Sequence, residues 1–263
     1  MDVAAAQLAA QPDEDRLFVT SGGVVVLDGA TAHDPEMPPA GTYVDVLGGE
    51  LRDRLDSGRD LRTILAESIE AAAERLSLQP GNAPSSTVAI VRTNCGAVDA
   101  LVLGDSPIAI GRINGSFDVL SDTRLAELNL PESQGYRERL ASGTGYDEIH
   151  RSLLQELQRK QRSRRNRDDG YWIAEADPEA AYHALTAHYP IEEVEWAVLA
   201  TDGASTPLEP LHVSWPQIAR MNSDDLDRLL DRCQRWEADH DPHGQLQPRS
   251  KRHDDKTIAV AHP

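Results

Sequence analysis

The amino-acid sequence predicts an α+β fold in which two sheets stack face to face under layers of helices. Short runs rich in β-branched residues occur along the chain beside longer runs whose apolar residues recur three and four positions apart. These runs follow the order strands, two helices, strands, helix and strand, which is typical of α+β proteins. We therefore expect a core made by two sheets and their helical layers.

The first elements are a strand pair and two helices. Residues 16–20 and 23–28 are predicted strands, joined by a hairpin turn at Ser21-Gly22 where glycine permits positive φ. Apolar side chains at helical spacing predict helices over about 43–55 and 61–76. Asp60 precedes the second helix, and we expect its side chain to cap that helix.

The rest of the chain is predicted to form one domain over 1–263. Further strands are expected at 86–92, 98–104, 107–112, 116–120, 171–174, 195–201 and 256–261. Helices are expected at 146–161, 178–187 and 223–238. Predicted loops, rich in Gly, Pro and charge, lie at 31–41, 162–170 and 240–253. None of these loops is long enough to require a second domain.

Composition and charge exclude several classes of protein. With 40% hydrophobic and 27% charged residues, the chain is typical of a globular protein. Its net charge of −18 argues against a nucleic-acid partner, because phosphates would be repelled over most of the surface. Two distant cysteines, Cys95 and Cys233, exclude a disulfide framework. No apolar run approaches a membrane span and residues 1–10 lack a signal pattern, so we expect a cytoplasmic protein.

Acidic residues stand at the ends of four predicted strands. Asp28 and Asp202 are each followed by glycine, Asp105 follows a strand, and Asp254 precedes one. A single Asp-Gly is usually only a turn. Four converging strand ends, however, would gather like charges that cannot all stay ionised without cations. Carboxylate ligands without His or Cys at metal spacing favour Mg²⁺ or Mn²⁺, the ions of two-metal hydrolytic sites.

These motifs resemble those of the PPM-type metal-dependent protein phosphatases, also called the protein phosphatase 2C family. The similar segments follow the order of the family and span nearly the whole chain: Asp13-Glu14-Asp15, Asp28-Gly29, Ser85-Ser86-Thr87-Val88, Gly104-Asp105-Ser106, Thr201-Asp202-Gly203 and Asp254-Asp255-Lys256-Thr257. The resemblance implies a bacterial-type, single-domain member with a four-layer α/β/β/α sandwich of two antiparallel sheets. It also implies a variable flap at about 121–194.

The resemblance further implies two Mg²⁺ or Mn²⁺ ions and assigns their ligands. Asp28 would bridge both ions, while Asp202 and Asp254 would hold the second, so that Asp28 and Asp202 are the predicted catalytic residues. Asp105, with Asp202, would match a weaker third position. The shell of the first ion would be completed by Glu14, Asp15 and the carbonyl of Gly29.

The activity implied by the resemblance is hydrolysis of phosphoserine and phosphothreonine in proteins, by a metal-bridging hydroxide and in opposition to a serine/threonine kinase. Two alternatives stay open: a small-molecule phosphoester as substrate, or a non-catalytic metal-binding module. The second rests on two departures from the family, Ala30 after Asp28-Gly29 and the lack of a basic residue before Asp15. The sequence predicts no oligomeric state.

A basic cluster falls within the expected flap of this acidic chain. Its candidate substrate-binding residues are Arg162, Arg164, Arg165 and Arg167. One hypothesis is that they select acidic or multiply phosphorylated substrates, because guanidinium groups pair well with phosphate and carboxylate. The other interpretation is a solvated helix end, whose positive charges suit the helix dipole.

Overall fold

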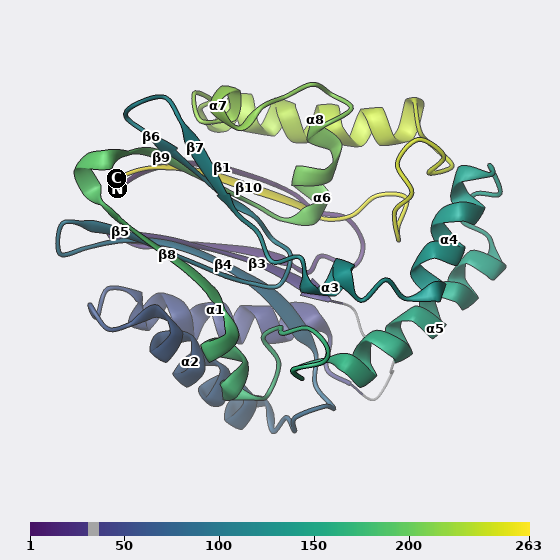
Figure 1. The fold of residues 1–263 in the computed structure, drawn as a ribbon, viewed down its shortest axis with the longest axis horizontal. Coiled ribbons are helices and arrows are strands. Elements are labelled where there is room, and N and C mark those ends of the chain that lie inside the picture. The colour runs from purple at the N-terminus through teal and green to yellow at the C-terminus, as the bar shows by residue number, and fades with distance from the viewer. Residues whose placement is uncertain (31–36) are drawn as a thin grey trace.

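Two antiparallel sheets form the centre of the molecule, flanked on both outer faces by helices (Figure 1). This computed structural model describes residues 1–30 and 37–263. The first sheet has the order β2 (Asp15–Val19), β3 (Gly23–Ala30), β4 (Ser85–Asn94), β5 (Ala97–Leu103) and β8 (Leu185–Pro190). The second has the order β1 (Asp2–Leu8), β10 (Lys256–His262), β9 (Val194–Ala200), β6 (Ile108–Arg112) and β7 (Phe117–Leu120). The predicted four-layer sandwich is confirmed.

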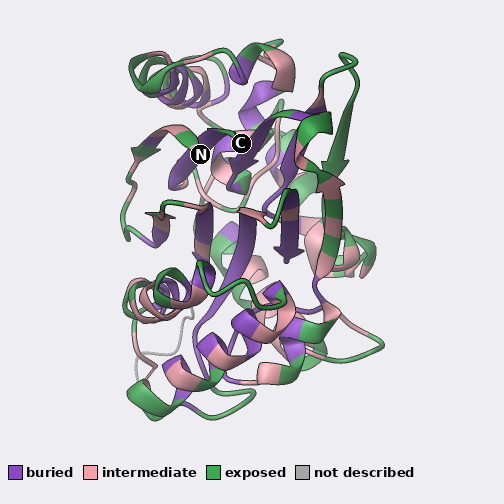
Figure 2. Cartoon of the chain, turned by 90° about the vertical axis from the view of Figure 1, so that its left-hand side faces the viewer, coloured by how far each residue is buried: buried purple, intermediate pink, exposed green. Residues whose placement is uncertain are grey.

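The alternation of side chains along the strands builds two of the core layers. In β3, Val24 and Val26 are fully buried between the two sheets. Val25 and Leu27 point to the opposite face and pack under the helices of the first sheet. Figure 2 shows these buried strands in the middle of the molecule, with exposed surfaces confined largely to the outer layers.

Helices cover the outer face of each sheet (Figure 1). Over the first sheet lie α1 (Ala40–Leu55) and α2 (Leu61–Leu76), and Asp60 caps α2 as predicted by accepting from the Thr63 amide at 3.1 Å. Over the second sheet lie α8 (Ser223–Asp239) and the short helix α7 (Trp215–Ile218). Among the described residues, no helix combines the length and the apolar character needed to cross a membrane.

The segment between β7 and β8 forms a helical arm at one end of the sandwich (Figure 1). It contains α3 (Arg124–Glu127), α4 (Pro131–Ala141) and α5 (Glu148–Arg164). Tyr136, Leu140 and Leu157 form a small core of their own between α4 and α5. His150 Nε2 also lies 3.0 Å from the carbonyl oxygen of Ser250, which ties the arm to the loop before β10.

Two predicted elements are wrong, and several observed elements were not predicted. Residues 171–174 form only isolated bridges rather than a strand. The predicted helix at 178–187 is a 3-10 helix, η1 (Pro178–His183), followed by strand β8, whose alternating exposure fits an edge strand. Strands β1 and β8 and helices α3, α4 and α7 were not predicted. The Ala-rich β1 has weak strand propensity and is defined by its pairing with β10. The remaining short helices are η2 (Ile191–Glu193), α6 (Asp202–Ser205) and η3 (Thr206–Leu208).

Candidate metal centre

The strand register brings polar side chains of the first sheet to one end of the inter-sheet core. Asp15 of β2 lies directly opposite Asp28 of β3, and Asp28 lies opposite Thr87 of β4. Directly opposite residues of antiparallel strands point to the same face of a sheet. Because Asp28 follows Val24 and Val26 at intervals of two, this face is the one that meets the second sheet.

The second sheet supplies its acidic residues to the same end. Thr201, directly after β9, donates a hydrogen bond from Oγ1 to Asp15 Oδ2 at 2.9 Å. The same hydroxyl accepts from the Thr257 amide of β10 at 3.0 Å. The bond to Asp15 joins the two sheets, and the bond from Thr257 joins β10 to the end of β9. Both lie at the point where Asp202 follows β9 and Asp254 precedes β10.

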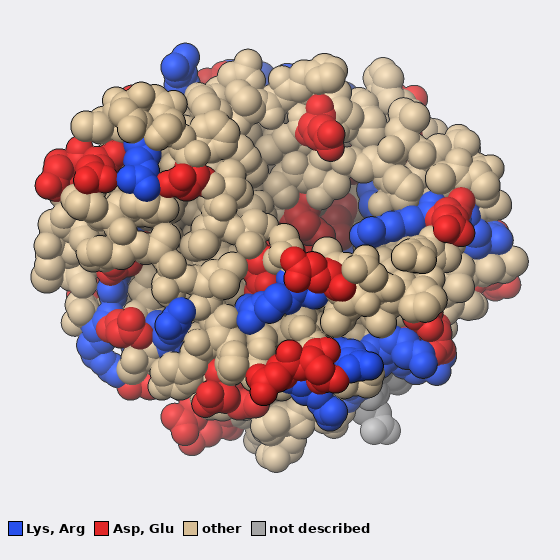
Figure 3. All heavy atoms as spheres, viewed as in Figure 1, with Lys and Arg blue, Asp and Glu red and all other residues tan. Residues whose placement is uncertain are grey.

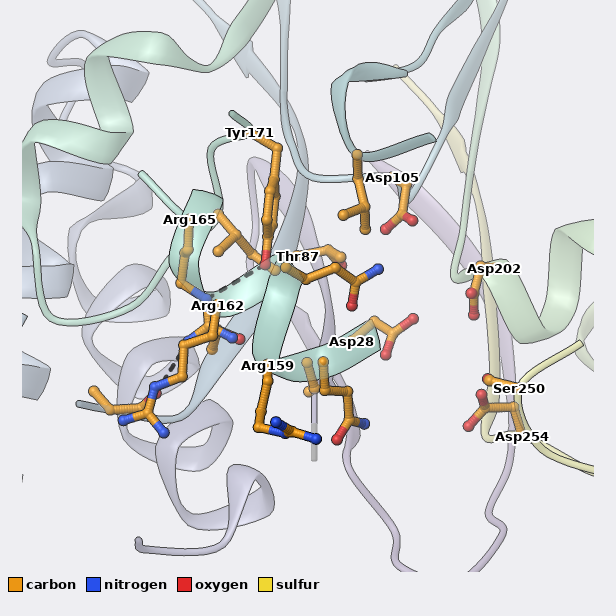
Figure 4. Close-up of a pocket in the computed structure, with 18 of the residues that line it drawn as sticks. Asp28, Thr87, Asp105, Arg159, Arg162, Arg165, Tyr171, Asp202, Ser250 and Asp254 are labelled. Carbon is orange, nitrogen blue, oxygen red and sulfur yellow. Dashed lines mark hydrogen bonds between the residues drawn. The ribbon is translucent and has the colours of Figure 1, made fainter. Parts of the chain in front are cut away.

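A cavity of about 620 Å³ opens at this end of the sandwich. Four aspartates line it, here called the strand-end aspartates: Asp28, Asp105, Asp202 and Asp254. Figure 4 shows Asp105, Asp202 and Asp254 on one side of the cavity, with Asp28 between them and the arginines of α5. On the molecular surface, the corresponding hollow has acidic side chains at its base and basic side chains at its rim (Figure 3). The structure therefore brings together the four aspartates that the sequence placed at strand ends.

Crowding of carboxylates at the cavity favours their protonated forms. Burial raises the pKa of Asp28 well above its usual range. The acidic neighbours whose charges raise it further are Asp15, Asp202, Asp254 and Asp105. Burial, followed by the charges of Asp105 and Asp254, raises the pKa of Asp202 to about 7. Burial also raises the pKa of Asp15 to about 8, against hydrogen bonds that lower it. The cluster must keep protons or attract cations.

The donors fit hard divalent cations in type and accessibility. Asp28, Asp105 and Asp254 are half-buried. Asp202 keeps exposed surface in the cavity wall, although its carboxyl is surrounded by protein atoms, so an ion can reach all four aspartates through the cavity. Within 1–30 and 37–263, no salt bridge joins Asp28, Asp105 or Asp202 to a basic side chain. In the same residues, no three His, Cys, Asp or Glu side chains converge into a finished metal site. The aspartates surround the cavity, and they are the residues that would hold Mg²⁺ or Mn²⁺.

The remaining predicted ligands are Gly29, which follows Asp28, and Glu14 and Asp15, directly before and at the start of the neighbouring strand β2. Gly29 lines the cavity, and its amide donates to the Glu14 carbonyl at 3.1 Å. A Cβ at Gly29 would lie only 2.8 Å from that oxygen, which explains the glycine. Glu14 and Asp15 are buried, and Asp15 lines a smaller neighbouring pocket of about 180 Å³ instead of the main cavity. The ligand roles of all three residues stay predictions.

The arginines of the expected flap separate into two groups. Arg162 and Arg165 line the cavity, whereas Arg164 and Arg167 do not. Arg162 Nε donates to the Gly81 carbonyl at 3.1 Å, and Arg165 donates to the Ala83 carbonyl at 3.3 Å. Arg164 instead pairs with Asp169 at the surface. Arg162 and Arg165 are therefore placed where a substrate could reach them, and their substrate-binding role stays a prediction. Arg164 and Arg167 lie outside the cavity lining.

Two lysines near Asp254 were missed by the sequence reasoning. Lys251 lines the cavity, and its Nζ donates to Asp254 Oδ1 at 2.8 Å. Burial lowers its pKa, but the charge and hydrogen bond of Asp254, together with the charges of Glu14 and Asp28, outweigh burial and raise the pKa of Lys251. Lys256 is fully buried, with Nζ 3.0 Å from Glu237 Oε1 and 3.0 Å from the Asp254 carbonyl oxygen. Both are basic residues within three positions of a predicted ligand, which was the available signal.

The fold is that of the PPM-type serine/threonine phosphatases. Comparison with solved structures finds the phosphatase Stp1 from Staphylococcus aureus, with 12% identity, a TM-score of 0.58, and 100% of this chain and 94% of that chain covered. The PPM Ser-Thr phosphatase MsPP from Mycobacterium smegmatis, in complex with cacodylate, has 15% identity, a TM-score of 0.51, and coverage of 99% and 97%. The catalytic domain of PstP, in complex with 2 manganese ions, has 16% identity, a TM-score of 0.53, and coverage of 99% and 97%.

No protein-family model matches the chain, and no curated protein sequence matches it. At these identities the structural likeness establishes the fold alone.

The raised pKa values predict an unusual pH dependence for the metal-free protein. Protonated Asp15, Asp28 and Asp202 contribute stability that is complete below the unfolded pKa of 3.8. It is lost as pH rises through the folded values, which are about 8 for Asp15 and about 7 for Asp202. We expect the melting temperature in EDTA to fall between about pH 5 and pH 8, and Mn²⁺ to reverse the fall.

Thermal unfolding followed by fluorescence across this pH range measures the effect. Asp28→Asn should flatten the slope in EDTA, because it removes one of the titrating carboxyls. A melting temperature in EDTA that stays level or rises toward pH 8 would contradict the electrostatic account.

Proposed function

We propose that the protein is a PPM-type, metal-dependent phosphatase that hydrolyses phosphoserine and phosphothreonine in proteins. The observation that carries this proposal is the cavity lined by the strand-end aspartates, contributed by both sheets. The shared fold of solved serine/threonine phosphatases supports it. The substrate would be a phosphoprotein made by a serine/threonine kinase.

Some residues of the chain would bind the ions, and others would hold these ligands in position. Two Mg²⁺ or Mn²⁺ ions, when bound, would activate a water for attack on phosphorus and offset charge on the phosphoryl oxygens. Asp28 would hold both ions, helped by Glu14, Asp15 and the Gly29 carbonyl, and Asp105 would serve a third position. Asp202 and Asp254 would hold the second ion. The hydrogen bond from Thr201 to Asp15 would keep the ligands of the two sheets in register.

Metal removal tests the proposal directly. The purified protein, treated with EDTA and then dialysed, should release little phosphate from a phosphothreonine peptide, and added Mn²⁺ or Mg²⁺ should restore hydrolysis. The same assay on nitrophenyl phosphate and on sugar phosphates separates a protein phosphatase from an enzyme for small phosphoesters. If no ester is hydrolysed with either ion, the non-catalytic metal-binding module becomes the better account.

The placement of the arginines predicts which of them act on peptide substrates. Arg162→Ala should raise KM for an acidic phosphopeptide by roughly 3- to 10-fold, because it removes a cation from the cavity wall. Arg167→Ala is the matched control, since Arg167 is exposed and lies outside the cavity lining. Neither change should alter KM for nitrophenyl phosphate, which is too small to span the cavity. Equal KM values of the two variants for the peptide would show that Arg162 does not contribute to substrate recognition.

A further inference from the structure

Lys251 is a cation placed directly against the strand-end aspartates. It belongs to the loop before β10, and its side chain lines the cavity with 37% of its surface exposed. Its ammonium donates to Asp254 Oδ1 at 2.8 Å. The backbone of this loop is held by neighbouring contacts, since the Ser250 carbonyl oxygen lies 3.0 Å from His150 Nε2 of α5. Lys251 therefore stands between the helical arm and the second sheet.

Other basic residues near the carboxylates already have different partners. Arg16, which follows Asp15, donates to Asp45 Oδ1 at 2.6 Å and to the Asp15 carbonyl at 2.7 Å. It lines the smaller pocket and not the main cavity. The basic residue nearest in sequence to Asp15 is therefore turned away from the space where a substrate would enter.

The arginines in the last turns of α5 and directly after it lie across the cavity from the aspartates of the second sheet. Figure 4 shows Arg159, Arg162 and Arg165 on the side opposite Asp202 and Asp254. Arg162 and Arg165 donate to backbone carbonyls at 81 and 83, which fixes their guanidinium groups on that wall. Within the described ranges 1–30 and 37–263, Lys251 is the cavity-lining cation that forms a salt bridge with a strand-end aspartate.

We propose that Lys251 binds the phosphoryl group of the substrate. This inference rests on the proposed phosphatase function and names the residue that takes up substrate phosphate. A phosphate dianion entering beside four aspartates meets repulsion that a nearby positive charge must offset. The lysine ammonium carries three donors on a flexible stem, so it can keep its contact with Asp254 while another N–H reaches a phosphoryl oxygen.

Binding of inorganic phosphate and steady-state kinetics together test the proposal. We would measure phosphate affinity by calorimetry on the Mn²⁺-loaded protein, and kcat and KM on nitrophenyl phosphate. Lys251→Met should weaken phosphate binding and raise KM by about 10-fold or more, as expected for loss of a charge-assisted hydrogen bond. Lys251→Arg should recover most of the affinity. Lys160→Met is the matched control, because Lys160 is a half-exposed lysine outside the cavity lining.

A separate Mn²⁺ titration distinguishes phosphate binding from a counter-ion role. If Lys251 only neutralises Asp254, Lys251→Met should tighten Mn²⁺ binding and leave phosphate affinity and KM unchanged, and this result would overturn the proposal. So would a wild-type protein that binds Mn²⁺ but no phosphate. Loss of phosphate affinity in Lys251→Met supports the proposal even if no ester is hydrolysed. An active enzyme with unchanged KM refutes the role of Lys251 while leaving the phosphatase function intact.

Discussion

Replacing Asp28 with Asn is expected to reduce kcat/KM for a phosphate ester by at least about 10²- to 10³-fold. Asp28 is the aspartate whose pKa is raised by the charges of all three other strand-end aspartates, so it occupies the electrostatic centre of the cluster. The amide has nearly the same shape but no charge, and it binds divalent cations far less well than a carboxylate does. Steady-state kinetics over a range of Mn²⁺ concentrations should show both weaker ion binding and a lower maximal rate.

The controls for this prediction separate folding from function. Asp28→Asn should remain folded, and in EDTA its melting temperature should fall less than that of the wild type as pH rises, because it removes a buried carboxyl whose ionisation its acidic neighbours oppose. Asp118→Asn is the matched substitution on an exposed strand, where Asp118 pairs with Arg112 at 2.8 Å and lies outside the cavity lining. An Asp28→Asn protein with wild-type kinetics at every Mn²⁺ concentration would exclude Asp28 from the centre.

Replacing Lys256 with Met is expected to destabilise the protein by about 3–5 kcal/mol, the usual cost of breaking a buried ion pair. Lys256 has no exposed surface, and its partner Glu237 is 2% exposed. The change leaves the Glu237 carboxylate buried with His253, whose Nδ1 lies 2.9 Å from Glu237 Oε2. It also removes the ammonium contact with the Asp254 carbonyl oxygen. Urea denaturation followed by circular dichroism measures the loss.

A double variant tests whether the cost comes from the orphaned charge. Lys256→Met combined with Glu237→Gln should be more stable than Lys256→Met alone, because no unpaired carboxylate remains buried. Mn²⁺ affinity should also fall in Lys256→Met, since the Asp254 backbone loses a contact that fixes its position. A loss of stability below about 1 kcal/mol would mean that water or His253 replaces the ammonium.

The sequence predicted the sandwich because its central strands are long and bounded by turn residues. The edges were harder to predict. Strand β8 has the sequence Leu-Thr-Ala-His-Tyr-Pro, in which apolar and polar residues alternate weakly, and it directly follows a helical turn. Strand β1 is Ala-rich and depends on its partner β10 at the other end of the chain. Local propensity cannot reveal a pairing that joins two distant segments.

The strand-end aspartates were found because each stands at a local boundary between apolar and turn residues. Lys251 does not stand at such a boundary, and its contact with Asp254 depends on how the loop before β10 folds. The arginines show an intermediate case. Arg162 lies in the last turn of α5, Arg165 follows the helix directly, and both line the cavity. The predicted helix ended at 161, whereas α5 reaches Arg164. A helix of that length would have placed Arg162 and Arg164 on different faces.

The origin of the aspartates on two separate sheets has a mechanical consequence. Asp28 belongs to the first sheet, whereas Asp202 and Asp254 flank strands of the second. An ion shared between these residues would cross-link the two sheets at this end of the sandwich, beside the hydrogen bond from Thr201 to Asp15. Separation of the two layers would then require release of the ion. Amide hydrogens of β3 and β9 should therefore exchange more slowly in Mn²⁺ than in EDTA, and to a similar degree in both strands.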